Sequence, residues 1–442
     1  MTNMKIKNLT YLVILAFLFS CKPELDEVTL SSGNVDFSKY VAIGNSLTAG
    51  FTDGELFYTG QQNSYPSILA QQMKPAGGGD FKQPMMMDEY GFGRRLVLDA
   101  TIQMPVLAGL ELNPQNFASI AGQGPFNNLG VPGAKSFHLV HGAESFSLAN
   151  PYYKRFAAQP GTSTILAEAI AQNPTFFTCW IGSNDVLGYA LAGGAADSIT
   201  SNEVFQMSLG ILLQEITANG AKGAIANITD LEPLPYFSFM NTQLPYNGLP
   251  ITLPEQAAAL NAGYAQLNAI IKSFGSNDTL AFALGQNPFV IADKDLPWGI
   301  RQMKSGELFL LTLPIDSIMN HGYGSMVPIP DKYVLTTSEL ANINNAIAGY
   351  NQIIAAYAAQ FDLAYVDMNT LLNQVATEGI TIDGVNFTST FVTGNTFSLD
   401  GIHLTGKASA IAANEFIKAI NLKYGSDLLE VSPLFYTGIT YR

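Results

Sequence analysis

The sequence predicts an α/β fold: a three-layer α/β/α sandwich with a mostly parallel sheet and long insertions. Short, solid apolar runs recur along the chain, as they do in strands that are buried on both faces of a parallel sheet. Segments with apolar residues at helical spacing alternate with these runs, as in strand–helix–strand units. The 442 residues are 48% apolar and only 13% charged. This composition provides a sizeable core and excludes a chain that is mostly disordered.

The core elements follow in order along the chain. Pro66 lies in the first turn of the first expected helix, Gly220 follows the second, and Thr336 with Glu339 provides a capping signal for the third. Strands are expected at residues 40–43, 176–181, 223–228 and 363–366, and helices at 65–73, 202–219, 337–360 and 406–423.

Two intervals are much longer than a simple crossover between strands. Residues 52–125 and 233–335 contain many glycine, proline and aromatic residues. We expect both to be insertions that decorate the sheet of one domain, at residues 37–425, which is followed by a C-terminal tail at 426–442. The chain shows no repeat with a period of 20–50 residues.

The N-terminal segment has the pattern of a secretory signal. Lys5 and Lys7 precede an apolar run at residues 9–19. That run is too short to cross a bilayer, which takes about 20 residues. We therefore expect residues 1–20 to be removed from the mature chain, and residues 21–36, which are mostly polar, to form a linker.

The end of this signal resembles the lipobox of bacterial lipoprotein precursors. Leu18 and Ser20 stand at the positions −3 and −1 relative to Cys21, although Phe19 between them is bulkier than usual. The resemblance implies that Cys21 is lipidated, so that the protein is anchored in the cell envelope without spanning the membrane. The anchor would place it in the outer membrane, at the periplasmic face or at the cell surface. An ordinary signal with an unrelated cysteine is the alternative.

The net charge restricts the possible binding partners, and the cysteine content restricts the possible reactive thiols. The net charge of −14 argues against nucleic acid and against anionic membrane surfaces as partners. Cys179 is the only other cysteine and lies in an apolar run. We expect it to be a buried, inert thiol rather than a nucleophile.

Four separated stretches carry residue types that suit nucleophilic catalysis. Ser46 and Asn184 each follow an expected strand, at the sheet edge where open α/β sheets bind ligands. A glycine-containing stretch at residues 128–134 permits close approach of the backbone. The spacing of Asp400 and His403 lets one loop bring a carboxylate to imidazole Nδ1, which leaves Nε2 available as a base. Each stretch alone is more simply a turn or a loop.

Together and in this order, the four stretches resemble the blocks of the SGNH hydrolase (GDSL lipase/esterase) superfamily. The resemblance implies the flavodoxin-like SGNH fold and leaves the two insertions and the tail uncovered. The family usually has aspartate before the nucleophile, where this chain has Asn45, a position outside the catalytic groups. The covered segments are approximately 37–60, 126–136, 174–232 and 336–424.

The resemblance also implies roles for individual residues. Ser46 would be the nucleophile, His403 the base, and Asp400 the carboxylate that orients it. The oxyanion hole would consist of the backbone N–H groups of Ser46 and Gly133 and the side-chain amide of Asn184. Gly130 is the alternative to Gly133, because the same stretch offers two glycines.

The expected activity is ester hydrolysis through an acyl-enzyme, without a cofactor or metal. The enzyme would be a carboxylesterase, a lipase or a carbohydrate deacetylase, because small, lipid and acylated-carbohydrate esters all remain open as substrates. An acyltransferase on the same fold and a non-catalytic, glycan-binding surface lipoprotein are the alternatives. Since fold and triad do not set specificity, we expect the apolar insertions to contribute the pocket for the acyl group.

Several polar residues are expected to have no part in the chemistry. Asp185 follows the oxyanion asparagine, where a structural hydrogen-bonding role is favoured over catalysis. His138 and His141 make a poor metal site, since zinc requires three or four ligands. His321 is expected to lie in a surface loop, although contact with substrate is an alternative.

Overall fold

The computed structural model describes residues 30–109 and 112–442. The predicted signal peptide and the predicted lipidation site at Cys21 lie outside these residues. Within the described ranges, no helix combines the length and the apolar character needed to cross a membrane.

A five-stranded, all-parallel sheet forms the centre of the fold, in the spatial order β13-β6-β5-β1-β4. β1, the first of these strands in the sequence, lies between β4 and β5, which are the next two. This is the flavodoxin-like arrangement, in which the chain reverses its direction of winding beside β1. The strands are β1 (Tyr40–Gly44), β4 (Asn128–Gly130), β5 (Phe176–Trp180), β6 (Lys222–Ala226) and β13 (Ala364–Val366).

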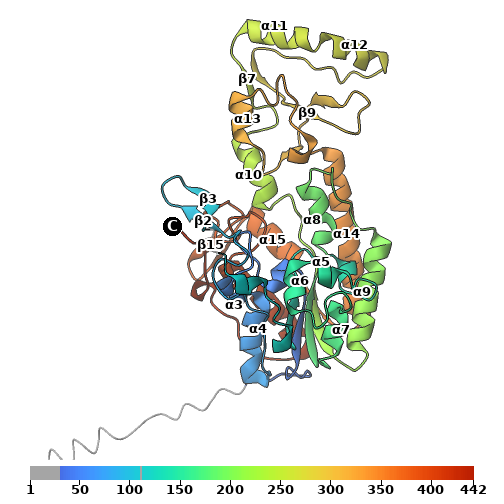
Figure 1. Cartoon of the computed structure of the whole chain (residues 1–442), viewed down its shortest axis with the longest axis vertical. Coiled ribbons are helices and arrows are strands. Elements are labelled where there is room, and N and C mark those ends of the chain that lie inside the picture. Colours follow the sequence, from blue (N-terminus) through green and yellow to red (C-terminus); the bar gives the residue numbers. More distant parts are fainter. Residues whose placement is uncertain (1–29, 110–111) are drawn as a thin grey trace, which may run out of the picture.

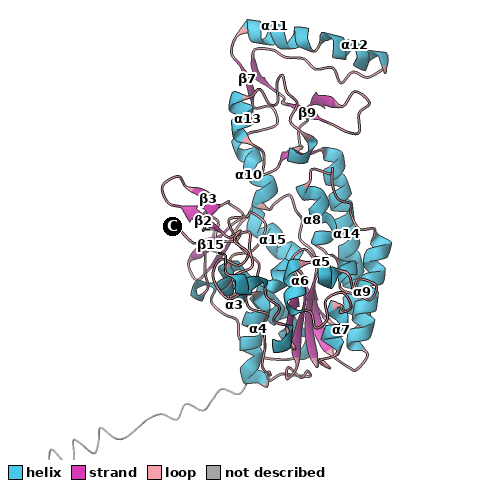
Figure 2. Cartoon of the chain, viewed as in Figure 1, coloured by secondary structure: helices cyan, strands magenta, loops and turns pink. Residues whose placement is uncertain are grey.

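Helices cover both faces of this sheet, which gives the three layers (Figures 1 and 2). On one face, α4 (Tyr65–Met73) packs against α16 (Gly406–Tyr424). The opposite face carries α7 (Ile165–Ile170), α9 (Asn202–Thr217) and α14 (Thr337–Gln360). The predicted fold class is therefore confirmed.

The predicted core strands and helices agree with the structure, but the strand β4 and the helix α7 were not predicted. Residues 128–134 were expected to form a loop, but Asn128–Gly130 pairs with β1 as the edge strand β4. Three residues that include a glycine carry no strand periodicity, so only the tertiary pairing defines this element. The predicted capping signal of α14 is present, because Thr336 Oγ1 accepts a hydrogen bond from the backbone of Glu339 and the Glu339 carboxylate accepts one in return.

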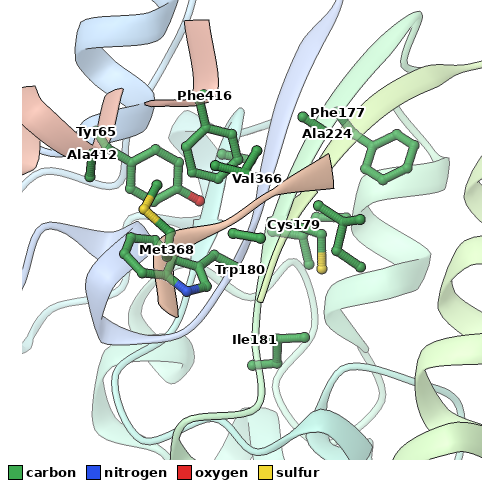
Figure 3. Close-up of a cluster of buried hydrophobic side chains, with 14 of the residues drawn as sticks. Tyr65, Phe177, Cys179, Trp180, Ile181, Ala224, Val366, Met368, Ala412 and Phe416 are labelled. Atoms are coloured by element: carbon green, nitrogen blue, oxygen red, sulfur yellow. The ribbon is translucent and has the colours of Figure 1, made fainter. Parts of the chain in front are cut away.

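Aromatic side chains fill the layer between the sheet and the α4–α16 pair (Figure 3). The rings of Tyr65 and Phe416 stack with centroids 4.8 Å apart, and Trp180 meets Tyr65 edge-on at 5.6 Å. The Tyr65 hydroxyl lies 3.0 Å from Thr48 Oγ1. The core therefore fixes the turn that directly follows β1, because Tyr65 and Trp180 are both almost fully buried.

The first insertion and the C-terminal tail fold against each other. The hairpin β2 (Leu96–Asp99) and β3 (Met104–Leu107) is antiparallel, and the last residues of the chain pair with β2 through Leu98. Further short helices of the body are α2 (Ser46–Ala49), α3 (Tyr58–Gln62), α5 (Phe146–Ala149), α6 (Pro151–Phe156), α8 (Asn184–Leu191) and α15 (Met368–Thr377). The hairpin β14 (Ile380–Ile382) and β15 (Val385–Phe387) precedes α16, and 3₁₀ helices lie at Lys74–Ala76, Pro114–Phe117, Ala121–Gln123, Ser136–His138, Asp331–Tyr333 and Pro433–Phe435.

The second insertion forms an arm that projects beyond the body of the molecule, at the top of Figure 1. Its own hydrophobic clusters stabilise it, and the buried Arg301 pairs with the carboxylates of Asp293 and Glu307. Most of residues 233–335 therefore extend away from the sheet, whereas Leu234, Phe237, Leu310 and Leu335 at the base of the arm pack into the main core. The elements are α10 (Pro235–Gln243), β7 (Leu249–Ile251), α11 (Pro254–Gly263), α12 (Ala265–Ser273), β8 (Gly285–Asn287), β9 (Val290–Ala292), β10 (Ile300–Gln302), β11 (Leu308–Phe309), α13 (Ile315–Asn320) and β12 (Val334–Leu335).

A substitution at Gly44, the last residue of β1, tests how tightly the sheet packs against the turn that follows this strand. A Cβ at this position would lie 2.5 Å from the backbone oxygen of Trp180 and would also overlap Thr48. We expect Gly44→Ala to lower the free energy of unfolding by about 1–3 kcal/mol or more, measured by urea denaturation. Gly263→Ala is the control, because a Cβ there meets nothing within 4 Å in a helix. It should leave stability unchanged or raise it by about 0.5–1 kcal/mol. Equal effects of the two substitutions would contradict the packing described here.

Candidate active site

The structure brings four of the predicted residues together at the carboxyl edge of the sheet. Ser46 is the first residue of α2, directly after β1, and Asn184 is the first residue of α8, shortly after the neighbouring strand β5. Asp400 and His403 lie in the loop that leads into α16. The site thus lies where the winding of the sheet reverses, the position at which open α/β sheets bind ligands.

Two hydrogen bonds join Asp400, His403 and Ser46. His403 Nδ1 lies 2.9 Å from Asp400 Oδ2, and His403 Nε2 lies 2.8 Å from Ser46 Oγ. An ionised carboxylate only accepts hydrogen bonds. In the neutral ring the proton therefore lies on Nδ1, and this N–H donates a hydrogen bond to Asp400. Nε2 is then the acceptor for the Ser46 hydroxyl. This is the geometry of a nucleophile, a base and an orienting carboxylate.

Asp400 is held in its ionised form. Burial acts to raise the pKa of this carboxyl, but the charge of His403 and several hydrogen bonds outweigh it and hold the pKa well below its usual range. Oδ1 accepts the backbone N–H groups of Ile402 and His403, at 2.9 and 2.8 Å. Oδ2 accepts the backbone N–H of Gly54 at 2.8 Å, in addition to His403. The carboxylate therefore stays fixed and charged beside the imidazole.

Aromatic packing supports the imidazole ring on one side. The Phe51 ring lies 4.7 Å from the His403 ring, and Tyr152 packs edge-on against Phe51 at 6.0 Å. The Tyr152 hydroxyl donates to Glu55 Oε1 at 2.8 Å, and Glu55 is fully buried. Phe51 and Tyr152 thus support the imidazole from outside the first insertion, which contributes only Glu55 as the partner of Tyr152.

Asn45 stands where the resemblance leads one to expect aspartate. Its Oδ1 accepts the backbone N–H of Leu47 at 3.0 Å and so caps α2. A carboxylate or an amide oxygen serves equally as this acceptor.

The predicted oxyanion donors differ in their availability. The Asn184 amide donates one hydrogen to the backbone oxygen of Ala134 at 2.9 Å, which fixes the side chain and leaves the second hydrogen unused. The Gly130 N–H donates to Asn128 Oδ1 at 2.9 Å. The Gly133 N–H has no acceptor among the described residues, and Gly133 is exposed with a φ of +81°. Of the two glycines, Gly133 is the one with a donor available.

Asp53 is a further residue beside the triad, and no sequence motif identifies it. Its backbone N–H donates to Ser398 Oγ at 2.9 Å, and its Oδ1 accepts the N–H of Leu399 at 3.1 Å. Burial raises the pKa of this carboxyl to about 6; the hydrogen bond from Leu399 lowers it, the nearby charge of Asp400 raises it, and the charges of Arg95 and His403 lower it. Asp53 fastens the loop that carries Asp400. In sequence, Asp-Gly at 53–54 indicates only a turn.

Asp185 lies behind the site and serves to hold a loop. It is fully buried, and its two carboxylate oxygens accept hydrogen bonds from the backbone N–H and the hydroxyl of Ser136, at 2.8 and 2.7 Å. These bonds tie the start of α8 to the segment that follows Gly133. The expected structural role matches these contacts.

The remaining candidates lie apart from the triad. Burial and the charge of Lys135 lower the pKa of His138 to about 4, while His141 and His321 each pair with one surface carboxylate. Among the described residues, no three metal-binding side chains gather into a possible ligand set. Burial raises the pKa of Cys179 to about 12, so this thiol is inert.

A small hollow opens beside the triad and has apolar walls. Its volume is about 30 Å³, and it is bordered by Ser46, Asn184 and His403. The insertions were expected to form part of this pocket, but they supply only Leu234. Core segments supply the other apolar walls, which are Leu47, Trp180, Leu187, Leu231, Leu372, Phe397, Ile402 and Leu404, and the polar residues Asn45, Ser183 and Thr229 also line the hollow.

Comparison with known proteins gives similarity only at the level of structure. No protein-family model and no curated protein matches this chain. A protein from Parabacteroides merdae, provisionally named a GDSL-like lipase, aligns with 10% identity over 88% of this chain and 98% of its own, at a TM-score of 0.36. LAE5, an alpha/beta hydrolase enzyme from the metagenome of Lake Arreo, Spain, aligns with 11% identity over 88% of this chain and 96% of its own, at a TM-score of 0.35. A mutant of Axe2, an acetyl-xylooligosaccharide esterase from Geobacillus Stearmophilus, aligns with 10% identity over 88% of this chain and 96% of its own, at a TM-score of 0.35.

The resemblance to the SGNH hydrolase superfamily therefore stands on two features of this chain itself. The four sequence blocks occur in family order, and the five-stranded parallel sheet is the fold that the resemblance implies.

The raised pKa of Asp53 predicts a pH-dependent stability. Between about pH 4 and 6 the folded protein holds a proton on this carboxyl that the unfolded chain has lost, so this group's contribution to stability falls as the pH rises. Asp53→Asn keeps the acceptor for Leu399 but does not titrate. We expect the variant to gain stability relative to the wild type as the pH rises from 4 to 6, measured by urea denaturation.

Ser398→Ala is the matched control for Asp53→Asn. It removes the hydroxyl that accepts the Asp53 N–H but leaves the carboxyl in place. The difference in the free energy of unfolding between Ser398→Ala and the wild type should therefore stay constant between about pH 4 and 6. A pH-independent effect of Asp53→Asn would contradict the expected titration.

Proposed function

We propose that this protein is a serine ester hydrolase that acts through an acyl-enzyme at Ser46. The observation that carries the proposal is the pair of hydrogen bonds that joins Asp400, His403 and Ser46 at 2.9 and 2.8 Å. Serine is a weak nucleophile unless a neighbouring base removes its proton. A binding protein would not need this arrangement beside a hollow with apolar walls.

In the first step, Ser46 Oγ attacks the carbonyl carbon of the ester while His403 Nε2 takes the hydroxyl proton. The Asp400 carboxylate stabilises the imidazolium that forms and holds the ring in place. His403 then returns the proton to the leaving alcohol, and the acyl group remains on Ser46.

The carbonyl oxygen becomes negatively charged in the tetrahedral intermediate. The N–H groups of Ser46 and Gly133 and the second amide hydrogen of Asn184 are the donors proposed to bind it. Because Ala134 already fixes the Asn184 amide, this donor needs little reorganisation during the reaction.

In the second step, His403 activates a water molecule that hydrolyses the acyl-enzyme. A sugar hydroxyl in place of water would make the protein an acyltransferase with the same triad. Product analysis in the presence of a sugar acceptor distinguishes the two. Transfer that exceeds hydrolysis would favour the acyltransferase.

We also propose that the mature protein is held in the cell envelope by lipid on Cys21. The support comes from the sequence, in which Leu18 and Ser20 precede Cys21 after a short apolar run. We expect Cys21→Ser to remove incorporation of labelled fatty acid and to release the protein from the membrane fraction. Cys179→Ser is the control and should remain anchored. An anchored Cys21→Ser variant would contradict the proposal.

The triad is tested by removing its members one at a time. We expect Ser46→Ala and His403→Ala each to lower kcat for a chromogenic acetate ester by about 10⁴-fold or more. A fluorophosphonate probe should label the wild type and fail to label Ser46→Ala. Normal turnover or labelling in the Ser46→Ala variant would rule out the mechanism.

The oxyanion donor is tested by Asn184→Ala. Loss of one such donor should lower kcat by about 10²–10³-fold, because the hydrogen bond strengthens as charge develops. Labelling of Ser46 by the probe should remain detectable, which shows that the fold and nucleophile are intact. An unchanged kcat would remove Asn184 from the mechanism.

A further inference from the structure

We propose that the hollow beside Ser46 receives the acyl group of the substrate and limits it to the size of acetyl. This inference rests on the proposed ester hydrolysis and names its substrate class: esters of acetic acid.

The hollow is bordered by the atoms that would handle a carbonyl group. Ser46, Asn184 and His403 all line it. A carbonyl carbon bonded to Ser46 Oγ, with its oxygen toward Asn184, therefore has its next substituent at the entrance of this space. The space is small: about 30 Å³ holds two or three water-sized groups, since one such group needs about 10–15 Å³ of this volume. Pockets for larger ligands are on the order of 300–1,000 Å³.

The walls select the acyl part of the ester over its alcohol part. Leu231, Leu234 and Phe397 are nearly buried, with exposed fractions of 4%, 5% and 4%. A sugar ring is too large for this space, and its hydroxyl groups would lose their hydrogen bonds to water against these walls. A methyl group forms no hydrogen bonds to water, so it loses none against these walls. The acyl group must also stay in place after the alcohol has left.

Leu372 on α15 closes the far side of the hollow. Together with Trp180 and Leu404, it separates the hollow from a second apolar cavity of about 10 Å³. Val375, also on α15, lines only that rear cavity. A longer acyl chain would need both spaces, and Leu372 stands between them.

Larger hollows of the described residues lie elsewhere. One of about 560 Å³ lies on the arm, between α11 and residues 325–326, and one of about 530 Å³ lies between residues 137–149 and α9. Neither is lined by Ser46, Asp400 or His403. A long acyl chain on Ser46 would therefore not reach either of these two larger hollows directly.

The test is a series of 4-nitrophenyl esters in which only the acyl chain changes. For the wild type we expect kcat/KM for acetate to exceed that for butanoate by at least about tenfold, and hydrolysis of octanoate to be weaker still. A butanoate or octanoate value equal to that of acetate overturns the inference. Loss of activity on every ester instead overturns the proposed function, so the two failures are distinguishable.

The matched variants are Leu372→Ala and Val375→Ala. Removing the Leu372 side chain should join the two cavities and reduce the acetate-to-butanoate ratio by about tenfold. Val375→Ala enlarges only the rear cavity and should keep the wild-type ratio. The ratio is measured on one preparation, so it does not depend on the fraction of folded enzyme.

If Leu372→Ala does not fold, Leu372→Val provides a smaller enlargement of the same wall. Its acetate-to-butanoate ratio should fall in the same direction. An unchanged ratio in a folded Leu372 variant, or an equal fall in Val375→Ala, overturns the assignment of this wall.

Discussion

The hydrogen bond between His403 Nε2 and Ser46 Oγ is the contact on which the rest of the site depends. It joins residues that are 357 positions apart in the chain, across a distance of 2.8 Å. No local element brings these two atoms together. The parallel sheet does so, because β1 delivers Ser46 to one edge and α16, packed beside α4 on the sheet, begins shortly after His403. Gly54 and Asp53 complete the connection by bonding to the loop that carries Asp400.

Two buried carboxyl groups in this loop region behave in opposite ways for physical reasons. Asp400 accepts three backbone N–H groups and faces the imidazole, so its pKa is held low. Asp53 accepts a single backbone N–H and lies near the charge of Asp400, so burial dominates and its pKa is raised to about 6. At Asp400 the charge of His403 and the hydrogen bonds outweigh burial, whereas at Asp53 burial outweighs the single backbone hydrogen bond. The arrangement favours one fixed negative charge beside His403.

Much of the fold and the triad could be predicted because their signals are local. Ser46 and Asn184 each follow a solid apolar strand, and Asp400 and His403 share one short loop. β4 could not be predicted, because its three residues become a strand only through pairing with β1. The role of Asp53 was hidden for the same reason, since its partners Ser398 and Leu399 are 345 and 346 residues away. The placement of the second insertion depends on its own clusters, which no motif records.

The great separation of the triad residues also has a consequence during synthesis. A ribosome adds about 5–20 residues per second. The interval between Ser46 and His403 therefore takes on the order of 20–70 s, during which the nucleophile exists without its base. Contacts of such long range also close slowly, because loop entropy must be overcome before they stabilise anything. Under the proposed mechanism, a growing chain is thus unable to attack esters until α16 has docked, and the appearance of ester hydrolysis would report the completion of folding.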